Sequence, residues 1–163
     1  MSFNEKAERL RRQVLSPLGF RLYLWRRLPL AAAAGLRLRT LDEQRCTVSL
    51  PGGWRTQNPF RSTYFAAQAM AAEMSTGAPA MVLVGGASAS VAMLVREVRG
   101  VFVKKIAGPS TFTFDGMASL HAAIERAAAT GEGETFVARS IGTTADGTVA
   151  AEFEITWSFK RRG

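Results

Sequence analysis

The 163-residue sequence contains one cysteine and one histidine. Cys46 cannot form a disulfide within the chain, and the charged N-terminus lacks the apolar core of a secretory signal, so we expect a cytoplasmic protein. A Ser-His-Asp triad would need His121 as its base. His121 lies in a segment with the periodicity of a surface helix, and nothing near it in the sequence indicates a triad. One thiol and one imidazole do not make a zinc site of the usual kind, and we expect neither a metal nor a cofactor.

Two nucleotide-binding motifs are also missing. The glycine-rich stretch "VLVGGASAS" lacks the lysine of a phosphate-binding loop, and no GxGxxG follows a predicted strand. The strands lack the paired aromatic and basic motifs of RNA-binding sheets, and no helix-turn-helix is visible. Nucleic acid is therefore a remote third candidate partner, although the charge favours phosphates in general.

Acidic residues are scarce, since thirteen Asp and Glu face 21 Lys and Arg for a net charge of +8. Such a balance attracts the phosphates of nucleic acid, anionic lipid or a phosphorylated ligand. The basic residues crowd the first 27 positions and the C-terminal end, at Lys6, Arg9, Arg11, Arg12, Arg21, Arg26, Arg27, Lys160, Arg161 and Arg162.

We expect one structural domain overall, in which a basic amphipathic segment over residues 1–28 precedes the main domain over residues 34–163. Helical spacing predicts a helix over residues 5–28 that bends or restarts near Pro17, and its apolar stripe consists of Leu10, Val14, Leu18, Leu22 and Trp25. Two interpretations stay open: the stripe packs on the domain, or the helix lies on a membrane surface, where arginine with tryptophan and tyrosine is a typical composition.

No long apolar run is free of helix breakers. The eighteen uncharged residues 78–95 reach the length of a membrane span, but Pro79, Gly85 and Gly86 make a poor one. The hydrophobic share of 47% is that of one ordinary globular core.

Strands are indicated by alternation of apolar and polar residues. Residues 35–50 predict a hairpin, 91–107 a long strand with a bulge or bend at Gly100, and "STFTFDG" a short strand. Asp146-Gly147 predicts a turn between the last two strands. In the final strand Phe153, Ile155, Trp157 and Phe159 alternate with polar residues and mark a core face.

Two further helices complete the pattern. Residues 117–130 predict a surface helix closed by Gly131. A second helix, capped by Ser62 or Thr63, is apolar or small on every side and should be buried; whether residues 78–84 extend it or begin a strand stays open. The predicted class is α+β, with an antiparallel sheet curled around the buried helix.

Glu73 carries the single charge between Arg61 and Arg96. On a helix its neighbours at spacings of three, four and seven are Met70, Gly77 and Ala66, all small or apolar. A desolvated carboxylate needs hydrogen bonds, a cation or a raised pKa, and a raised pKa suits a general base near neutral pH. The alternative is a structural Glu73, paired with an arginine or reaching water at a dimer seam.

The region from about 34 to 160 resembles the hot-dog thioesterases of the phenylacetate-degradation type. Asn58 matches the family's Asn at the end of a loop, and Glu73, fifteen positions later in "AAE", matches the acid of its "LAD" or "LAE". "VRGVFVKKIAG" and "DGTVAAEFEITWSFK" resemble the family's strand with its basic turn and its final hairpin. The extra N-terminal helix resembles most closely a hot-dog branch classed as a domain of unknown function.

This resemblance implies a curved antiparallel sheet around a long helix, a homodimer and hydrolysis of acyl-CoA. Whether two dimers pair further into a dimer of dimers stays open. In the family the thioester carbonyl sits at the N-terminus of the central helix. Transferred to this chain, backbone amides around Tyr64, Phe65 and Ala66 polarise the carbonyl, Glu73 acts as base or nucleophile, and Asn58 orients substrate or water. Lys104 and Lys105 are candidates for contact with CoA phosphates.

The chain departs from the family pattern at the helix start. Phe60 and Arg61 replace a His-Gly, and Tyr64-Phe65-Ala66 replaces a His-Gly-Gly, so Tyr64 and Phe65 either line an acyl tunnel or block it. Two functions therefore stay open: an acyl-thioester hydrolase, and a non-catalytic protein that binds an acyl chain, fatty acid or lipid.

Overall fold

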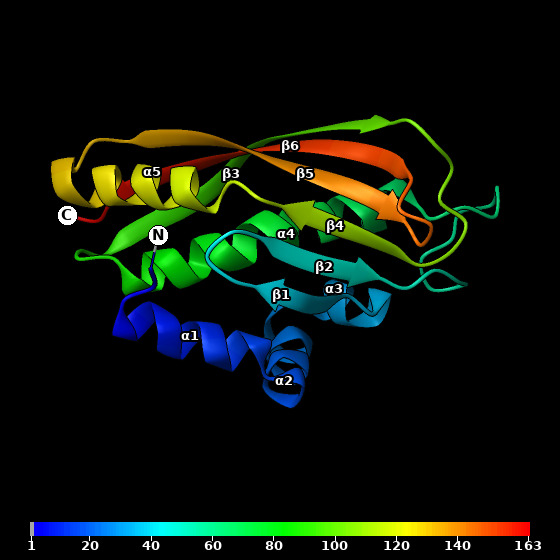
Figure 1. Cartoon of the computed structure of the whole chain (residues 1–163), viewed down its shortest axis with the longest axis horizontal. Helices are drawn as coiled ribbons and strands as arrows, with labels where there is room; N and C mark the ends of the chain where they lie inside the picture. The colour runs from blue at the N-terminus through cyan, green and yellow to red at the C-terminus, as the bar shows by residue number, and fades with distance from the viewer. Residues whose placement is uncertain (1) are drawn as a thin grey trace.

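The computed structural model describes residues 2–163, which form five helices and six strands (Figure 1). In chain order the elements are α1 (Glu5–Leu15), α2 (Pro17–Arg27), α3 (Pro29–Ala34), β1 (Arg37–Leu41), β2 (Cys46–Leu50), α4 (Phe65–Gly86), β3 (Val91–Phe102), β4 (Ser110–Phe114), α5 (Met117–Thr130), β5 (Glu134–Thr144) and β6 (Val149–Arg161).

All six strands belong to one antiparallel sheet in the order β1-β2-β4-β5-β6-β3. The sheet curves around α4, whereas α1 and α2 lie on the side of α4 away from β3, β5 and β6 (Figure 1). The predicted α+β class and hot-dog arrangement are confirmed. Both hairpins are also as predicted, and Gly147 adopts the left-handed φ of 83° that its turn requires.

The central helix α4 lies inside the curve because its small side chains let the strands approach closely. Fourteen of its 22 residues are buried. The helix continues through Pro79 to Gly86, so residues 78–84 are helix. Trp157, from the buried face of β6, donates a hydrogen bond from Nε1 to Thr76 Oγ1 at 3.0 Å and ties the sheet to the middle of the helix.

The predicted cap of this helix is wrong. The helix begins at Phe65, and its N-cap is Tyr64, whose side chain makes no capping hydrogen bond. Thr63 stays extended because its N–H donates to the Ile106 carbonyl at 2.7 Å. A contact distant in sequence therefore sets the start of α4.

The N-terminal segment restarts at Pro17 as predicted, and Ser16 both ends α1 and caps α2. The break turns α2 to a new direction, so the five apolar residues of the predicted stripe do not share one environment. Leu10 and Val14 pack against the core. The remaining members of the stripe are exposed, namely Leu18, Leu22 and Trp25.

Two smaller predictions also differ from the structure. The strand expected over 91–107 ends at Phe102, and its irregularity lies between Val95 and Glu97, not at Gly100. Gly100 pairs regularly with Phe153, and a Cβ there would lie 2.8 Å from the Phe153 ring. Helix α3 was not predicted; it ends at Ala34 and is capped by Gly35, which has a φ of 78°.

Among residues 2–163 no helix is both long and apolar enough to cross a bilayer. The uncharged run 78–95 is divided between the end of α4 and the start of β3.

Candidate functional site

The N-terminal end of α4 leaves two backbone donors without an acceptor. The N–H of Tyr64 donates to the Thr56 carbonyl at 2.6 Å, so this amide is occupied. Within residues 2–163, the N–H groups of Phe65 and Ala66 have no hydrogen-bond partner. Free N–H groups and the helix dipole favour negative charge at this end. The three amides implied by the family resemblance are therefore reduced to two.

A cleft of about 450 Å³ opens at this helix end. It lies between the loop before α4 and the segment after β3, and exposed aromatic rings form much of its rim. Its lining consists of Asn58, Pro59, Phe60, Ser62, Thr63, Tyr64, Phe65, Gln68, Phe102, Val103, Lys104, Lys105 and Ile106.

Gln68 places an unpartnered polar atom in this lining. Its side chain is only 6% exposed, and Nε2 donates to the Thr63 carbonyl at 3.0 Å. Its Oε1 is buried without a hydrogen-bond partner among the described residues. A buried acceptor of this kind costs about 1–3 kcal/mol unless a donor reaches it. Gln68 is the one amide side chain in α4 and was not among the predicted site residues.

Asn58 organises the loop that forms one wall of the cleft. Its Oδ1 accepts from the Phe60 N–H at 3.0 Å and from both the N–H and the hydroxyl of Ser62, at 3.1 and 3.0 Å. Because Oδ1 is occupied, the amide nitrogen is the group left for a ligand. In the same loop Arg61 adopts a left-handed φ of 56°, at the position where the resembled family has glycine.

The two predicted lysines lie on the opposite wall. Lys105 donates from Nζ to the Phe60 carbonyl at 2.8 Å, which joins the two walls. Lys104 lies near Asp146, whose pKa is lowered to about 2 by hydrogen bonds from Thr144 and Thr148 and, more weakly, by the Lys104 charge. The cleft therefore carries a positive rim next to the free helix N-terminus.

Glu73 lies outside this lining, farther along α4. Its carboxylate makes no hydrogen bond or ion pair among residues 2–163, and desolvation raises its pKa above the ordinary value of 4.5. Gly77 makes room for it, since a Cβ at Gly77 would lie 2.8 Å from Glu73 Oε1 and 3.1 Å from the Trp157 ring. The carboxylate is thus held over Gly77, one turn farther from Phe65.

The structure brings most of the predicted site residues together. Asn58, Tyr64, Phe65, Lys104 and Lys105 line one cleft, and Ala66 contributes a free N–H at the same helix end. Within the described residues, no three His, Cys, Asp or Glu side chains cluster as a metal site would require.

Comparison with known proteins agrees with this architecture. Residues 19–159 match the family described as "Domain of unknown function (DUF4442)". The match begins within α2, so it includes part of the segment preceding residue 34. No curated protein matches the chain significantly.

Solved structures with the same fold include several proteins named as thioesterases. A Pseudomonas aeruginosa protein of unknown function, described as a probable thioesterase, has a TM-score of 0.74 at 19% identity and covers 90% of this chain and 97% of its own. A thioesterase from Haemophilus influenzae has a TM-score of 0.65 at 9% identity, with 90% and 91% covered. A second thioesterase from P. aeruginosa, crystallised as a mutant, has a TM-score of 0.62 at 18% identity. The match covers 96% of this chain and 94% of that protein. At these identities the likeness establishes the hot-dog fold.

Proposed function

The chain belongs to the family described as "Domain of unknown function (DUF4442)", and we propose that it is a homodimeric acyl-thioester hydrolase acting on acyl-CoA. The observation that carries this proposal is the cleft at the N-terminus of α4. Two free N–H groups and a positive rim meet there at the end of a buried helix. The names of the structurally similar thioesterases support the same reaction class.

In the proposed reaction the thioester carbonyl oxygen accepts hydrogen bonds from the N–H groups of Phe65 and Ala66. These donors stabilise the oxyanion that forms when water attacks the carbonyl carbon. Glu73 takes a proton from that water as a general base, the C–O bond forms and the C–S bond breaks, and the proton passes to the leaving thiolate. A carboxylate whose pKa is raised by burial is suited to this step near neutral pH.

The remaining cleft residues bind and orient the substrate. Gln68 Oε1 and the Asn58 amide nitrogen are an acceptor and a donor available to the polar part of the acyl-pantetheine arm. Lys104 and Lys105 contact the CoA phosphates at the rim. The aromatic rings of Tyr64 and Phe65 line the entrance for the acyl chain.

A second copy of the chain is needed to complete this site. Phe65 and Glu73 are eight residues apart on α4, which corresponds to about 12 Å along the helix axis. That separation is too large for one thioester to contact both. In a two-fold dimer whose axis is perpendicular to α4, the two central helices run antiparallel, and Glu73 of one copy approaches the Phe65 end of the other.

The strand β3 offers the surface for this pairing. It is a 12-residue strand at one edge of the sheet, next to β6 (Figure 1). Most of its residues are exposed. An exposed, partly apolar edge of this length is a template for strand pairing. Its C-terminal residue Phe102 also lines the cleft, so the edge and the candidate site are continuous.

The proposal is tested by assaying the purified protein against an acyl-CoA chain-length series. We expect thioester hydrolysis at some length, with Glu73→Gln and Glu73→Ala both reducing kcat. Unchanged turnover in both variants would remove Glu73 from the mechanism. Copurifying acyl chains without turnover at any length would replace hydrolysis by acyl-chain or lipid binding.

The shared site is tested by mixing two inactive variants. Glu73→Gln keeps the amide donors, whereas Phe65→Pro keeps the carboxylate and removes one donor. Hybrid dimers formed by subunit exchange contain one intact site, so mixing should restore about a quarter of the wild-type rate. A site formed within one chain predicts no recovery.

A further inference from the structure

Helix α2 carries an apolar stripe that the fold leaves uncovered. Leu18, Leu22 and Trp25 are 79%, 56% and 53% exposed. At about 100° per residue these three side chains fall within an arc of about 60°. Phe20 and Leu24 lie on the opposite side of α2 and are buried. The helix is therefore apolar on two sides, and only one of them contacts the protein core.

Arginines flank this outward stripe. Arg21 and Arg26 lie on its two sides at helical spacing, and Leu30 of α3 adds another exposed apolar side chain. Residues 16–41 contain five arginines and no aspartate or glutamate. Among the described residues none of these arginines forms an ion pair. We call this surface, made by the exposed residues of 16–41, the α2 face.

A basic pocket of about 370 Å³ adjoins the stripe on one flank. Arg21, Arg37, Arg39 and Arg55 line it together with Trp25, over an apolar floor. Arg39 donates to the Ser49 hydroxyl at 2.7 Å, which holds it in place. Guanidinium groups gathered without a carboxylate match the geometry and charge of a phosphate.

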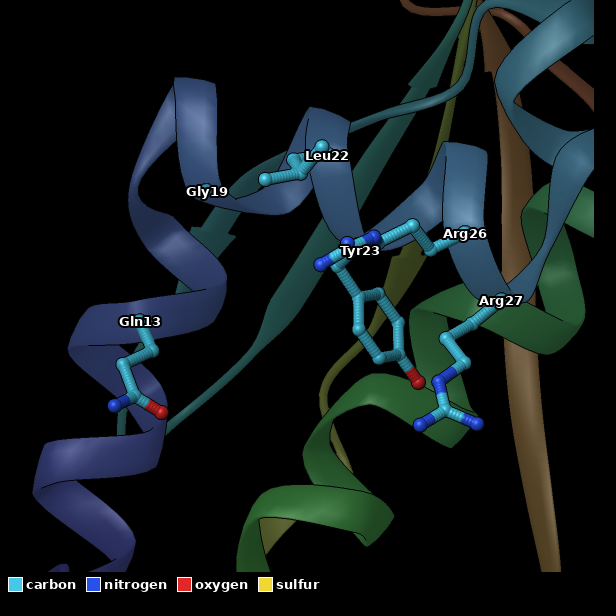
Figure 2. A pocket seen from close by; sticks show the side chains of 6 residues that line it. All are labelled: Gln13, Gly19, Leu22, Tyr23, Arg26 and Arg27. Carbon is cyan, nitrogen blue, oxygen red and sulfur yellow. The ribbon is translucent and has the colours of Figure 1, made fainter.

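A groove of about 880 Å³ adjoins the stripe on the other flank. Figure 2 shows Leu22 and Arg26 of α2 extending toward the side of the groove where Gln13 of α1 lies, and the Tyr23 ring directed toward α4. The Tyr23 hydroxyl lies 3.5 Å from Met81 Sδ of α4 and closes the floor. The α2 face thus combines an apolar stripe with a polar, basic margin.

We propose that the α2 face binds the surface of a bilayer containing anionic phospholipids. Leu18, Leu22 and Trp25 enter the boundary between headgroups and acyl chains, while the flanking arginines contact phosphates. The charge of the α2 face favours an anionic bilayer over a second copy of the chain. Self-pairing would place the five arginines of one copy against the five of the other, whereas anionic headgroups neutralise them. The proposal does not depend on the proposed hydrolase activity.

Vesicle co-sedimentation of the full-length protein tests the inference. We expect binding to phosphatidylcholine vesicles that contain phosphatidylglycerol, little binding to pure phosphatidylcholine, and weaker binding at high salt. Leu22→Glu should weaken binding to the mixed vesicles by at least about tenfold, since it places a charge in the apolar stripe. A Trp54→Phe background retains Trp25 and the buried Trp157. Its emission should shift to the blue on binding, and this shift should be absent when Trp25→Phe is added.

The matched control is Val137→Glu, at an exposed apolar position of β5 that is 54% exposed and lies outside the α2 face. It should bind vesicles as the wild type does. Equal binding to neutral and anionic vesicles, or an equal loss in both variants, overturns the proposal. So does a change of oligomeric state in Leu22→Glu by sedimentation velocity, which would assign the face to a second copy.

Discussion

At its C-terminal end α4 is closed by another helix, whereas at its N-terminal end it is open. Asn4, the N-cap of α1, donates from Nδ2 to the Gly86 carbonyl at 2.7 Å, and a Cβ at Gly86 would lie 2.6 Å from the Ala7 Cβ. At the other end the Tyr64 cap makes no side-chain hydrogen bond, and within residues 2–163 the N–H groups of Phe65 and Ala66 have no acceptor at the helix end that borders the cleft.

The two ends of α4 therefore differ in role: the closed end contributes mainly to stability, and the open end to the proposed function. The closed end buries small side chains and satisfies a terminal carbonyl, which stabilises the fold. The open end keeps donors, and the Gln68 acceptor, without partners, which costs stability and leaves them free for a ligand. Substitutions at the open end should therefore change activity first, and substitutions at the closed end should change stability first.

The two largest expected effects are those of Glu73→Gln and Phe65→Pro, and Phe65→Pro tests the open end directly. Tyr64 is already extended (φ −63°, ψ 138°) and position 65 is the first of the helix, so proline fits there and removes one N–H. We expect kcat to fall by about 10²–10³ with little change in Tm. Phe65→Ala keeps the N–H and is the control for the lost ring. An equal loss in both variants would refute the oxyanion role.

Glu73→Gln should lower kcat by about 10²–10⁴. The raised pKa of Glu73 predicts that wild-type activity falls as pH drops through that pKa, because only the carboxylate accepts a proton. Stability changes in the opposite sense. A raised folded-state pKa contributes stability below the unfolded value of 4.5, which is lost as pH rises through the folded pKa.

Glu73→Gln should therefore be more stable than the wild type near neutral pH, with a difference that shrinks under acid conditions. Urea denaturation over a pH series measures it. A variant that is less stable than wild type at neutral pH would indicate that Glu73 has a stabilising partner in the dimer.

At the closed end Asn4→Ala should lower the free energy of unfolding by about 1–2 kcal/mol. It removes the bond to Gly86 and the cap of α1, where Asn4 Oδ1 accepts from the Ala7 N–H at 2.9 Å. Asn4→Ser keeps a capping oxygen and should lose less. The comparison of the two ends predicts that kcat of the folded fraction stays at the wild-type value in both.

The smallest expected effect is that of Arg61→Gly, at the open end. Glycine adopts the φ of 56° without the Cβ penalty, so the variant should be more stable by about 1 kcal/mol. Arg61→Ala keeps the Cβ and should show no gain. Chemical denaturation distinguishes the two, and a gain in both would mean that the arginine side chain, not the backbone, is the strained group.

The fold was predictable where burial of one side of an element makes apolar residues recur at a regular spacing in the sequence. The alternation in β6 and the small-residue run of α4 indicate their elements directly, because each reflects which side faces the core. The start of α4 was not predictable, since the Thr63–Ile106 bond that decides it joins distant segments. The outward turn of α2 likewise follows from tertiary packing.

The candidate site was predictable only through the spacing of a family pattern. That spacing selected Asn58 and the residues around Phe65, which the structure places around one cleft. Gln68 was overlooked because an amide among alanines carries no charge to single it out. In the proposed dimer a second copy brings Glu73 to the cleft. The sequence of one chain does not indicate which residues meet across a dimer interface.

The buried thiol of Cys46 has a practical consequence. Cys46 lies in β2 between β1 and β4 and is 0% exposed, and desolvation, with a smaller contribution from Asp42, raises its pKa. It is the one thiol in the sequence. A thiol reagent therefore reacts only when this part of the sheet opens, and its labelling rate in the native state reports the frequency of that opening without any engineered probe.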